Sequence, residues 1–240
     1  MSPIPKIPAR FRPRGLTFLY EDRDLIVIEK EAGLLTADMI REEGHTAFAA
    51  VNNYLRKGES RSNRHAWLVH RLDRETSGVL IFAKSEEAMN RLKDNWSNNE
   101  KLYLAVLVGS PKSKQGILES YLAEDRNYFV HSVRDPQAGK LSRTRYTVIG
   151  EGRGVSLVKI RLLTGRKNQI RVHFSEAGYP VLGDRKYGDR RDRAPRLFLH
   201  AKSIAFDHPF SGERMCFETA VPPPFSRLFP KFTDEDWRKK

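Results

Sequence analysis

The sequence predicts an α+β fold built on a mixed, largely antiparallel sheet with flanking helices. Apolar stretches of strand length outnumber amphipathic stretches of helix length, and the two kinds do not alternate regularly. Residues 158–162 alternate apolar and basic side chains, which is typical of an antiparallel strand with one face in water. The chain has 240 residues, enough to bury a sizeable core.

The first elements follow from local patterns. The apolar run LIVIEK (25–30) predicts a buried strand that ends in a turn at Gly33. Residues 46–55 place apolar side chains on one helical face, and Thr46 is the expected N-cap. The run VLIFA (79–83) predicts a second buried strand. Ser85 then begins a helix whose apolar residues recur every three or four positions.

The remaining elements are mostly strands. A further strand is expected at 103–109, and the glycine-broken, charged segment 110–154 suits hairpins and loops. Residues 168–178 change to a helical spacing that Gly178 ends. Strands are expected again at 196–206 and 213–221, joined by a turn.

The charge balance points to a polyanionic partner. There are 43 Lys and Arg against 30 Asp and Glu, a formal charge of +13. Neutralising phosphates releases condensed counterions, so nucleic acid is the simplest partner for such a chain. The alternative is a soluble protein that is merely basic.

Other features narrow the class of protein. The single cysteine, Cys216, excludes an intramolecular disulfide and a cysteine-rich zinc site, which favours the cytoplasm, and its strand context predicts ordinary packing. No apolar run approaches the roughly 20 residues that cross a bilayer, so no membrane association is expected. Residues 1–15 carry prolines and basic residues without an acid, and we expect an extended basic arm ahead of one domain at 16–240.

One motif carries chemistry. HRLDRETSGVLIFAK (70–84) places Asp73 between two arginines, directly before an apolar strand. A carboxyl group at such a place tends to take up a proton, and a nearby guanidinium reverses that tendency. A partly buried, ionised aspartate suits nucleophilic attack at a sugar carbon. By themselves, the three residues Arg-Leu-Asp are more typical of a surface ion pair.

The whole motif resembles the signature of the RluA family of RNA pseudouridine synthases. Further segments resemble the same family in the same order: LYEDRDLIVIEKEAGLLT (19–36), KLYLAVLVG (101–109), LLTGRKNQIRVHFSEAGYPVLGDRKYG (162–188) and LFLHAKSIAFDHP (197–209). The similarity spans roughly residues 16–225, so several specific motifs in order make chance a poor explanation.

The resemblance implies the pseudouridine synthase fold and the conversion of uridine to pseudouridine in structured RNA, either ribosomal or transfer RNA. The enzyme would break the bond from N1 to C1′, turn the base and rejoin it through C5. No metal, nucleotide or redox cofactor is implied, and we expect a monomer. The small S4 RNA-binding domain of many relatives is not expected in front of a core that begins near residue 18.

The resemblance also assigns the catalytic residues. Asp73 would act as nucleophile or general base. Tyr103 would stack on the target base and serve in proton transfer. Judged from the sequence pattern alone, without the family resemblance, Tyr103 would be interpreted as a tyrosine packed in the core. Arg171 would pair with Asp73 and keep it charged. Judged from the sequence pattern alone, Arg171 would be interpreted as a solvent-facing arginine on a helix.

Four further residues are expected to bind the substrate. Ile170 and Leu199 would form apolar walls of the base pocket. Arg71 would occupy the space that the flipped nucleotide leaves, since a planar cation can replace both a stacked base and its hydrogen bonds. Arg166 would contact phosphate or support its loop. The stretch DRKYGDRRDRAPR (184–196), with six basic residues, is either a phosphate-contacting loop or merely a solvated one.

Two positions depart from the usual family pattern. This chain has Glu31 where a proline is usual, and Asn168 where a histidine is usual. Neither belongs to the expected catalytic residues, so catalysis should survive. We expect both to border the RNA-facing surface and to affect which RNA is chosen.

Two other classes of protein compete with this interpretation. A catalytically silent RNA-binding protein on the same fold would keep the basic surface, but would have no need of Asp73, Tyr103 and Arg171 together. A metal-dependent nuclease would use His70, Asp73 and His65 as ligands. No third acidic ligand stands nearby in the sequence, and the two flanking arginines would repel a cation.

Overall fold

The computed structural model describes residues 13–37, 45–57, 59, 62–189 and 191–239. The chain forms two compact units, and neither is a single continuous stretch. The first unit comprises residues 1–99 and 203–219, and the second comprises 100–202 and 220–240. Most of the expected basic arm, at 1–12, lies outside the described residues. The expectation of one domain over residues 16–240 stays a prediction.

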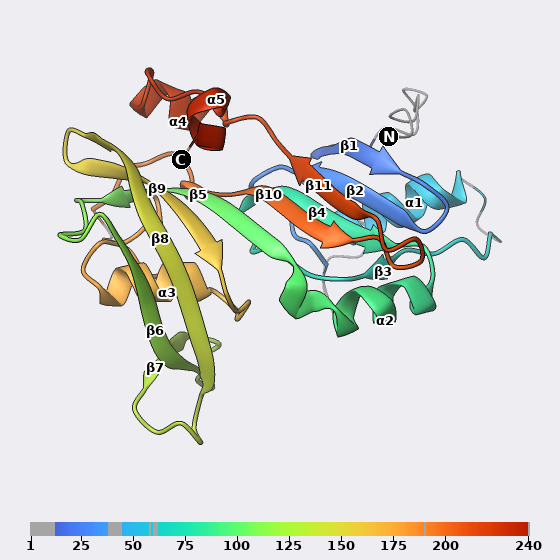
Figure 1. The fold of residues 1–240 in the computed structure, drawn as a ribbon, viewed down its shortest axis with the longest axis horizontal. Helices are drawn as coiled ribbons and strands as arrows, with labels where there is room; N and C mark the ends of the chain where they lie inside the picture. The colour runs from blue at the N-terminus through green and yellow to red at the C-terminus, as the bar shows by residue number, and fades with distance from the viewer. Residues whose placement is uncertain (1–12, 38–44, 58, 60–61, 190, 240) are drawn as a thin grey trace. The chain divides into compact units, whose positions relative to one another are not determined.

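The sheet of the first unit has the strand order β1-β2-β4-β10 (Figure 1). Its strands are β1 (Leu16–Glu21), β2 (Leu25–Lys30), β4 (Ser77–Ala83) and the part of β10 (Leu199–Asp207) from Ser203 onward. Two shorter strands flank this path: β3 (Trp67–Leu68) pairs with β4, and β11 (Arg214–Glu218) pairs with β10. β2 runs antiparallel to both β1 and β4, and all seven residues of β4 are buried.

The two helices of this unit begin where the sequence predicts. Helix α1 (Ala47–Arg56) is capped by Thr46, whose side chain accepts a hydrogen bond from the amide of Ala49. Helix α2 (Glu86–Asp94) is capped in the same way by Ser85. A 3-10 turn, η2 (Trp96–Asn98), follows α2. The apolar residues of α2, Ala88 and Leu92, share one core cluster with residues on one face of β2 and β4.

The second unit continues the order as β10-β5-β9-β8-β6-β7. Its strands are β5 (Glu100–Val108), β6 (Gln115–Glu124), β7 (Val130–Val133), β8 (Lys140–Gly152) and β9 (Val155–Leu162). Its helices are α3 (Gln169–Glu176), α4 (Pro223–Leu228) and α5 (Asp234–Lys239). The ladders β5·β9, β8·β9, β6·β8 and β6·β7 are antiparallel. The prediction of an α+β fold with a largely antiparallel sheet is therefore confirmed.

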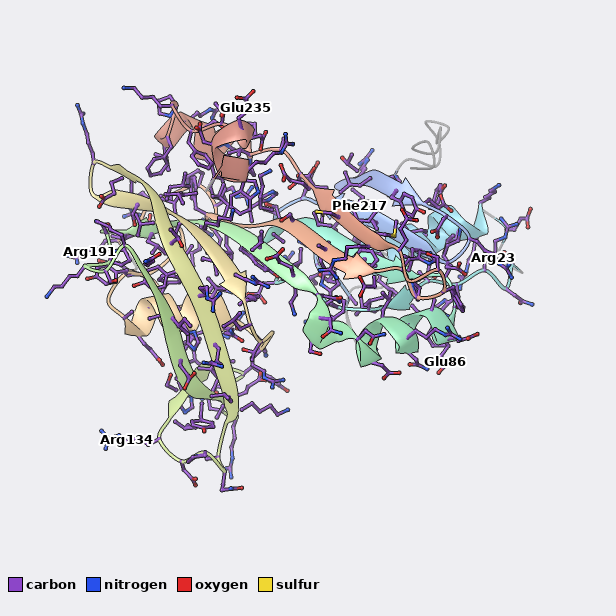
Figure 2. All side chains as sticks on the ribbon, viewed as in Figure 1. Arg23, Glu86, Arg134, Arg191, Phe217 and Glu235 are labelled. Carbon is purple, nitrogen blue, oxygen red and sulfur yellow. The ribbon has the colours of Figure 1, made fainter. Side chains whose placement is uncertain are left out.

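The segment 110–154 forms the hairpins expected of it. Figure 1 shows β6, β7 and β8 extending together as an arm beyond α3, and Figure 2 shows Arg134 near the end of this arm. Inside the unit, α3 packs on the sheet through Ile170 and Phe174, which share a core cluster with residues of β5, β8 and β9.

One detail of the sequence interpretation is wrong. Cys216 lies in a strand, β11, as expected, but its side chain is exposed instead of packed in a core. Successive residues of a strand point to opposite faces, and the buried face of β11 is taken by Phe217. Among the described helices, none is both long and apolar enough to cross a bilayer.

Two buried histidines make the second unit sensitive to acid. Burial, reinforced by the positive charges of Arg196 and Lys202, lowers the pKa of His200 to about 3. Burial also lowers the pKa of His173 to about 4, although the carboxylate of Glu176 opposes this. Both side chains are therefore neutral in the folded protein, and protons bind first to the unfolded chain, where a histidine titrates near 6.5.

We predict that stability is full above about pH 6.5 and falls as the pH drops towards 4, by about 1.4 kcal/mol per pH unit for each histidine. His173→Gln removes one titrating group and keeps two polar ends for its partners, Ser120 and Thr144. Urea unfolding at about pH 7 and about pH 5 should show a shallower pH dependence in the variant. Equal slopes in the two proteins would contradict the prediction.

Candidate active site

The loop that carries Asp73 is clamped to the turn after β2. Lys30, the last residue of β2, is fully buried, and its Nζ donates to the main-chain oxygens of Glu31 (2.9 Å), Leu34 (2.7 Å) and Arg74 (3.1 Å). The amide of Gly33 donates to the same Arg74 oxygen, and Arg74 Nε donates back to the oxygen of Gly33. One lysine thus ties this turn to the loop about 40 residues further on.

A second set of contacts fixes the beginning of the loop. The buried Thr36 hydroxyl donates to the oxygen of Leu72 (2.8 Å), and the amide of Leu72 donates back to that hydroxyl (3.1 Å). His70 Nε2 accepts a hydrogen bond from the amide of Ile81 in β4 (3.2 Å). At the other end, the amide of Thr76 closes a turn onto the oxygen of Asp73 (3.1 Å).

These anchors alternate along the loop. Positions 70, 72 and 74 are held by β4 and by residues 30–36, whereas the side chains of Arg71, Arg74 and Glu75 are exposed and that of Asp73 is partly exposed. The loop therefore presents the side chains of Arg71 and Asp73 on a rigid backbone. Rigid placement of the reacting group is what catalysis at a fixed substrate atom requires.

Three predicted residues of the second unit come together. Tyr103 in β5 lies opposite Ile160 of β9 and packs, partly buried, against one hydrophobic cluster. Ile170 and Leu199 belong to the same cluster, with 4% and 3% of their surface exposed. The structure thus joins the expected stacking residue and both expected apolar walls.

Arg171 has a partner that the sequence did not reveal. Its Nε and Nη2 donate to the two oxygens of Asp184, at 2.7 and 2.8 Å, and both side chains are buried. Burial alone would raise the pKa of Asp184. The hydrogen bonds and charge of Arg171, with the amides of Tyr187 and Lys186, outweigh burial and hold that pKa below its usual value. Arg171 is therefore not a solvent-facing helix arginine, and its pairing with Asp73 stays a prediction.

The two departures from the family pattern have local explanations. The amide of Glu31 donates to the oxygen of Gly15 (2.9 Å), a bond that a proline could not make. Asn168 adopts a left-handed backbone (φ +53°), which asparagine tolerates better than most residues. Its side chain accepts a hydrogen bond from the Tyr187 hydroxyl and is buried, so Asn168 does not border the surface as expected.

The basic side chains of Arg166 and of the segment 184–196 are mostly exposed to solvent. Arg166 is exposed, and its amide donates to the Gln169 side chain at the start of α3. The aspartates of the segment fold it: Asp189 and Asp192, like Asp184, accept main-chain amide hydrogen bonds. The described basic side chains are exposed, apart from the partly buried Arg196. A phosphate-contacting role for this segment stays a prediction.

The geometry weighs against the nuclease alternative. Nε2 of His70 is already occupied by the amide of Ile81. Within the described part of the chain, the group of side chains close enough to hold an ion is Asp22, Asp24 and His208. Nδ1 of His208 accepts from two amides, those of Phe210 and Ser211, so its proton resides on Nε2, which faces Asp22 at 3.0 Å. His208 therefore completes a hydrogen-bonded turn.

Comparison with known proteins identifies the family of this chain. The model of the RNA pseudouridylate synthase family matches residues 24–176, which include Asp73, Tyr103 and Arg171. An uncharacterized RNA pseudouridine synthase of Aquifex aeolicus is 34% identical over 244 residues, covering 92% of this chain and 75% of that protein. Ribosomal large subunit pseudouridine synthase C of Haemophilus influenzae is 36% identical over 213 residues, covering 85% and 64%.

Solved structures show the same fold. Human RNA pseudouridylate synthase domain containing 1 superposes with a TM-score of 0.69 at 26% identity, covering 92% of this chain and 89% of that one. Human RNA pseudouridylate synthase domain containing 4 gives a TM-score of 0.73 at 23% identity, covering 89% and 92%. The chain belongs to the RluA-type family of RNA pseudouridylate synthases, which are isomerases acting on RNA.

Sequence reasoning missed three residues of the site: Lys30, Thr36 and Asp184. Lys30 ends a strand that is apolar apart from Glu29, so a charged residue at a predicted buried position was the available signal. Thr36 and Asp184 gave no such signal, because their partners lie elsewhere in the chain.

We predict that Lys30→Met destabilises the protein by about 3 kcal/mol, because it leaves main-chain oxygens without their charged donor. Lys84→Met is the matched control. Lys84 also donates to a main-chain oxygen, that of Asp22, but its side chain is 23% exposed, so water can replace it. Urea unfolding should show the larger loss for Lys30→Met, and equal losses would contradict the clamp.

Proposed function

We propose that the protein converts specific uridines of structured RNA, ribosomal or transfer, to pseudouridine, with Asp73 as nucleophile or general base. The observation that carries this proposal is the loop 70–76, which is clamped at positions 70, 72 and 74 and presents Arg71 and Asp73 between these anchors. The family membership supplies the reaction class, and the loop supplies a candidate for its reactive carboxylate.

The chemistry needs no change of oxidation state. The bond between N1 and C1′ breaks, the base turns, and a bond forms between C5 and C1′. C5 then loses its proton, and N1 carries one in the product. A carboxylate can trap or stabilise the electron-poor C1′, or remove the proton from C5. Both roles use the ionised carboxylate of Asp73.

The other residues receive supporting roles. Tyr103 would stack on the target base, with Ile170 and Leu199 as apolar walls, which accords with their shared cluster. Arg171 would supply the positive charge that keeps Asp73 ionised. Asp184 would fix the plane of that guanidinium through its two hydrogen bonds. Arg166 would contact phosphate, in agreement with its exposure.

The choice of RNA is supported by charge and by one relative. The formal charge of +13 favours a large polyanion over a free nucleoside. The Haemophilus influenzae relative is named for the large ribosomal subunit, which makes ribosomal RNA the first substrate to test. We propose that the enzyme acts as a monomer in the cytoplasm and without a cofactor.

We predict that Asp73→Asn lowers pseudouridine formation by at least about a thousandfold, because it removes a group that takes part in bond making. RNA affinity should change little, since phosphate contacts provide most of it. Glu75→Gln is the matched control, since it removes the same charge from an exposed position two residues away. The measurement is single-turnover pseudouridine formation, read by carbodiimide modification and primer extension.

Turnover of Asp73→Asn within tenfold of the natural protein would remove Asp73 from the chemistry. Loss of activity in both variants would point to the charge of the loop and not to one carboxylate. An inactive natural protein that still binds RNA would favour the catalytically silent alternative.

We predict that Arg71→Ala slows the reaction most when the target uridine lies in a stable, stacked helix, where unstacking costs a few kcal/mol. A target in a loose loop should be affected much less, because its base is already unstacked. Arg71→Lys should retain only part of the rate on the paired target, since lysine keeps the positive charge but lacks the planar guanidinium group that can replace a stacked base. Single-turnover rates at saturating enzyme on both RNAs make the comparison, and equal rate losses would exclude the flipping role.

A further inference from the structure

The arm of the second unit carries an aromatic side chain in an unusual position. Tyr128, in the turn between β6 and β7, is 71% exposed and has a left-handed backbone (φ +59°). That conformation suits glycine or asparagine and is strained for a bulky residue. Asn127, which tolerates it better, is the preceding residue. The chain therefore maintains a large ring in solvent at a conformational cost.

The turn around Tyr128 is rigid. Asp125 Oδ1 accepts hydrogen bonds from the amides of Asn127 and Phe129, both at 2.8 Å. The amide of Tyr128 donates to the oxygen of Asp125, and the amide of Asp125 donates to the oxygen of Phe129. An exposed ring on an ordered backbone loses little conformational entropy when a ligand stacks on it.

One lysine lies against this ring and a second holds its backbone. Lys167 Nζ lies 5.3 Å from the Tyr128 ring centroid and forms an ion pair with Glu124. Lys186 Nζ donates to the main-chain oxygen of Tyr128 (2.7 Å) and lies 5.3 Å from the ring centroid of Phe129. A solvent-facing aromatic ring beside a lysine is suited to a base joined to a phosphate.

A hollow of about 510 Å³ adjoins this ring, since Glu124 and Lys167 line it. Its other lining residues include the exposed side chains of Lys140 and Arg166 and the backbone of Gly165. Three basic side chains against one carboxylate, itself paired with Lys167, leave the hollow positively charged. Its size falls in the range of sites for small ligands, a nucleotide among them.

We propose that Tyr128 and this hollow form a binding subsite for an unpaired nucleotide of the RNA substrate, separate from the target uridine. The base stacks on Tyr128, and the adjoining phosphates bind Lys140, Arg166 and Lys167. RNA is favoured as the occupant because the ring and the cations match its two components, base and phosphate. This subsite rests on the proposed function, because it assumes that RNA is the substrate.

Binding of a short fluorescein-labelled oligouridylate, followed by anisotropy, tests the subsite without requiring catalysis. Tyr128→Gly should weaken binding roughly fivefold to a hundredfold, the range measured for loss of one stacking platform. Tyr128→Phe should stay within about twofold. Glycine suits the left-handed backbone, so the thermal midpoint should not fall, and weaker binding then reports a lost contact. A blunt-ended RNA duplex, in which every base is paired, should bind both variants within about twofold of the natural protein.

Two further variants separate the cations from the ring. Lys140→Gln should lower the slope of log affinity against log salt by about 0.7, the share of one phosphate on a single strand, whereas Tyr128→Gly should leave it unchanged. A Cβ atom added at Gly165 meets no atom within 4 Å, so the backbone can accept a side chain there. Gly165→Leu should obstruct the hollow with every cation retained, and weaken binding about fivefold or more.

Phe210→Ala is the matched control. Phe210 is 43% exposed in the turn before β11, with the Arg91 guanidinium 4.7 Å from its ring centroid, so it resembles Tyr128 in chemistry but not in place. It should leave oligouridylate binding unchanged. Full affinity in Tyr128→Gly would overturn the subsite. Pseudouridine formation is measured in parallel, so a failed subsite in an active enzyme is distinguished from a failed function.

Discussion

The buried ion pair between Arg171 and Asp184 organises the second unit. A charge taken out of water costs several kcal/mol unless its hydrogen-bonding groups are satisfied. Here Asp184 accepts two bonds from Arg171 and two from main-chain amides, so the pair fixes helix α3 against the turn that follows it. That turn places Tyr187, whose hydroxyl donates to Asn168 and accepts from the amide of Val130. One carboxylate thus sets the position of the helix, of the turn and of strand β7 in the arm beyond them.

In the first unit, buried polar side chains hold the loop that carries Asp73. Its reactive loop has no regular secondary structure, so its backbone groups need partners from elsewhere. Lys30 supplies them from the end of β2 and Thr36 from the segment after it, and both side chains are nearly inaccessible to water. The placement of Asp73 therefore depends on residues that never touch a substrate. A loop held in this way can keep a carboxylate partly exposed without becoming mobile.

Local patterns were sufficient to predict most of the fold. The caps Thr46 and Ser85, the strands β2 and β4, and the stop of α3 at Gly178 follow from side chains within a few residues of one another. The motif containing Asp73 was predictable for the same reason. The partner of Arg171 was not, because Asp184 lay within a run of charges that gave no sign of which one is buried. The predictions that Asn168 borders the surface and that Cys216 is packed were wrong for a similar reason, since only tertiary contacts decide which way a side chain faces.

Strand β10 has a consequence for how the protein is made. Its first four residues belong to the second unit and its last five to the first, and the chain passes between the units again at residues 219 and 220. A ribosome delivers the chain from its N-terminus, so the first unit lacks β10 and β11 until about residue 219 has emerged. The second unit likewise waits for α4 and α5. The first unit therefore cannot finish folding until most of the second has been synthesised, and the exposed edge of β4 must be protected from wrong partners until then.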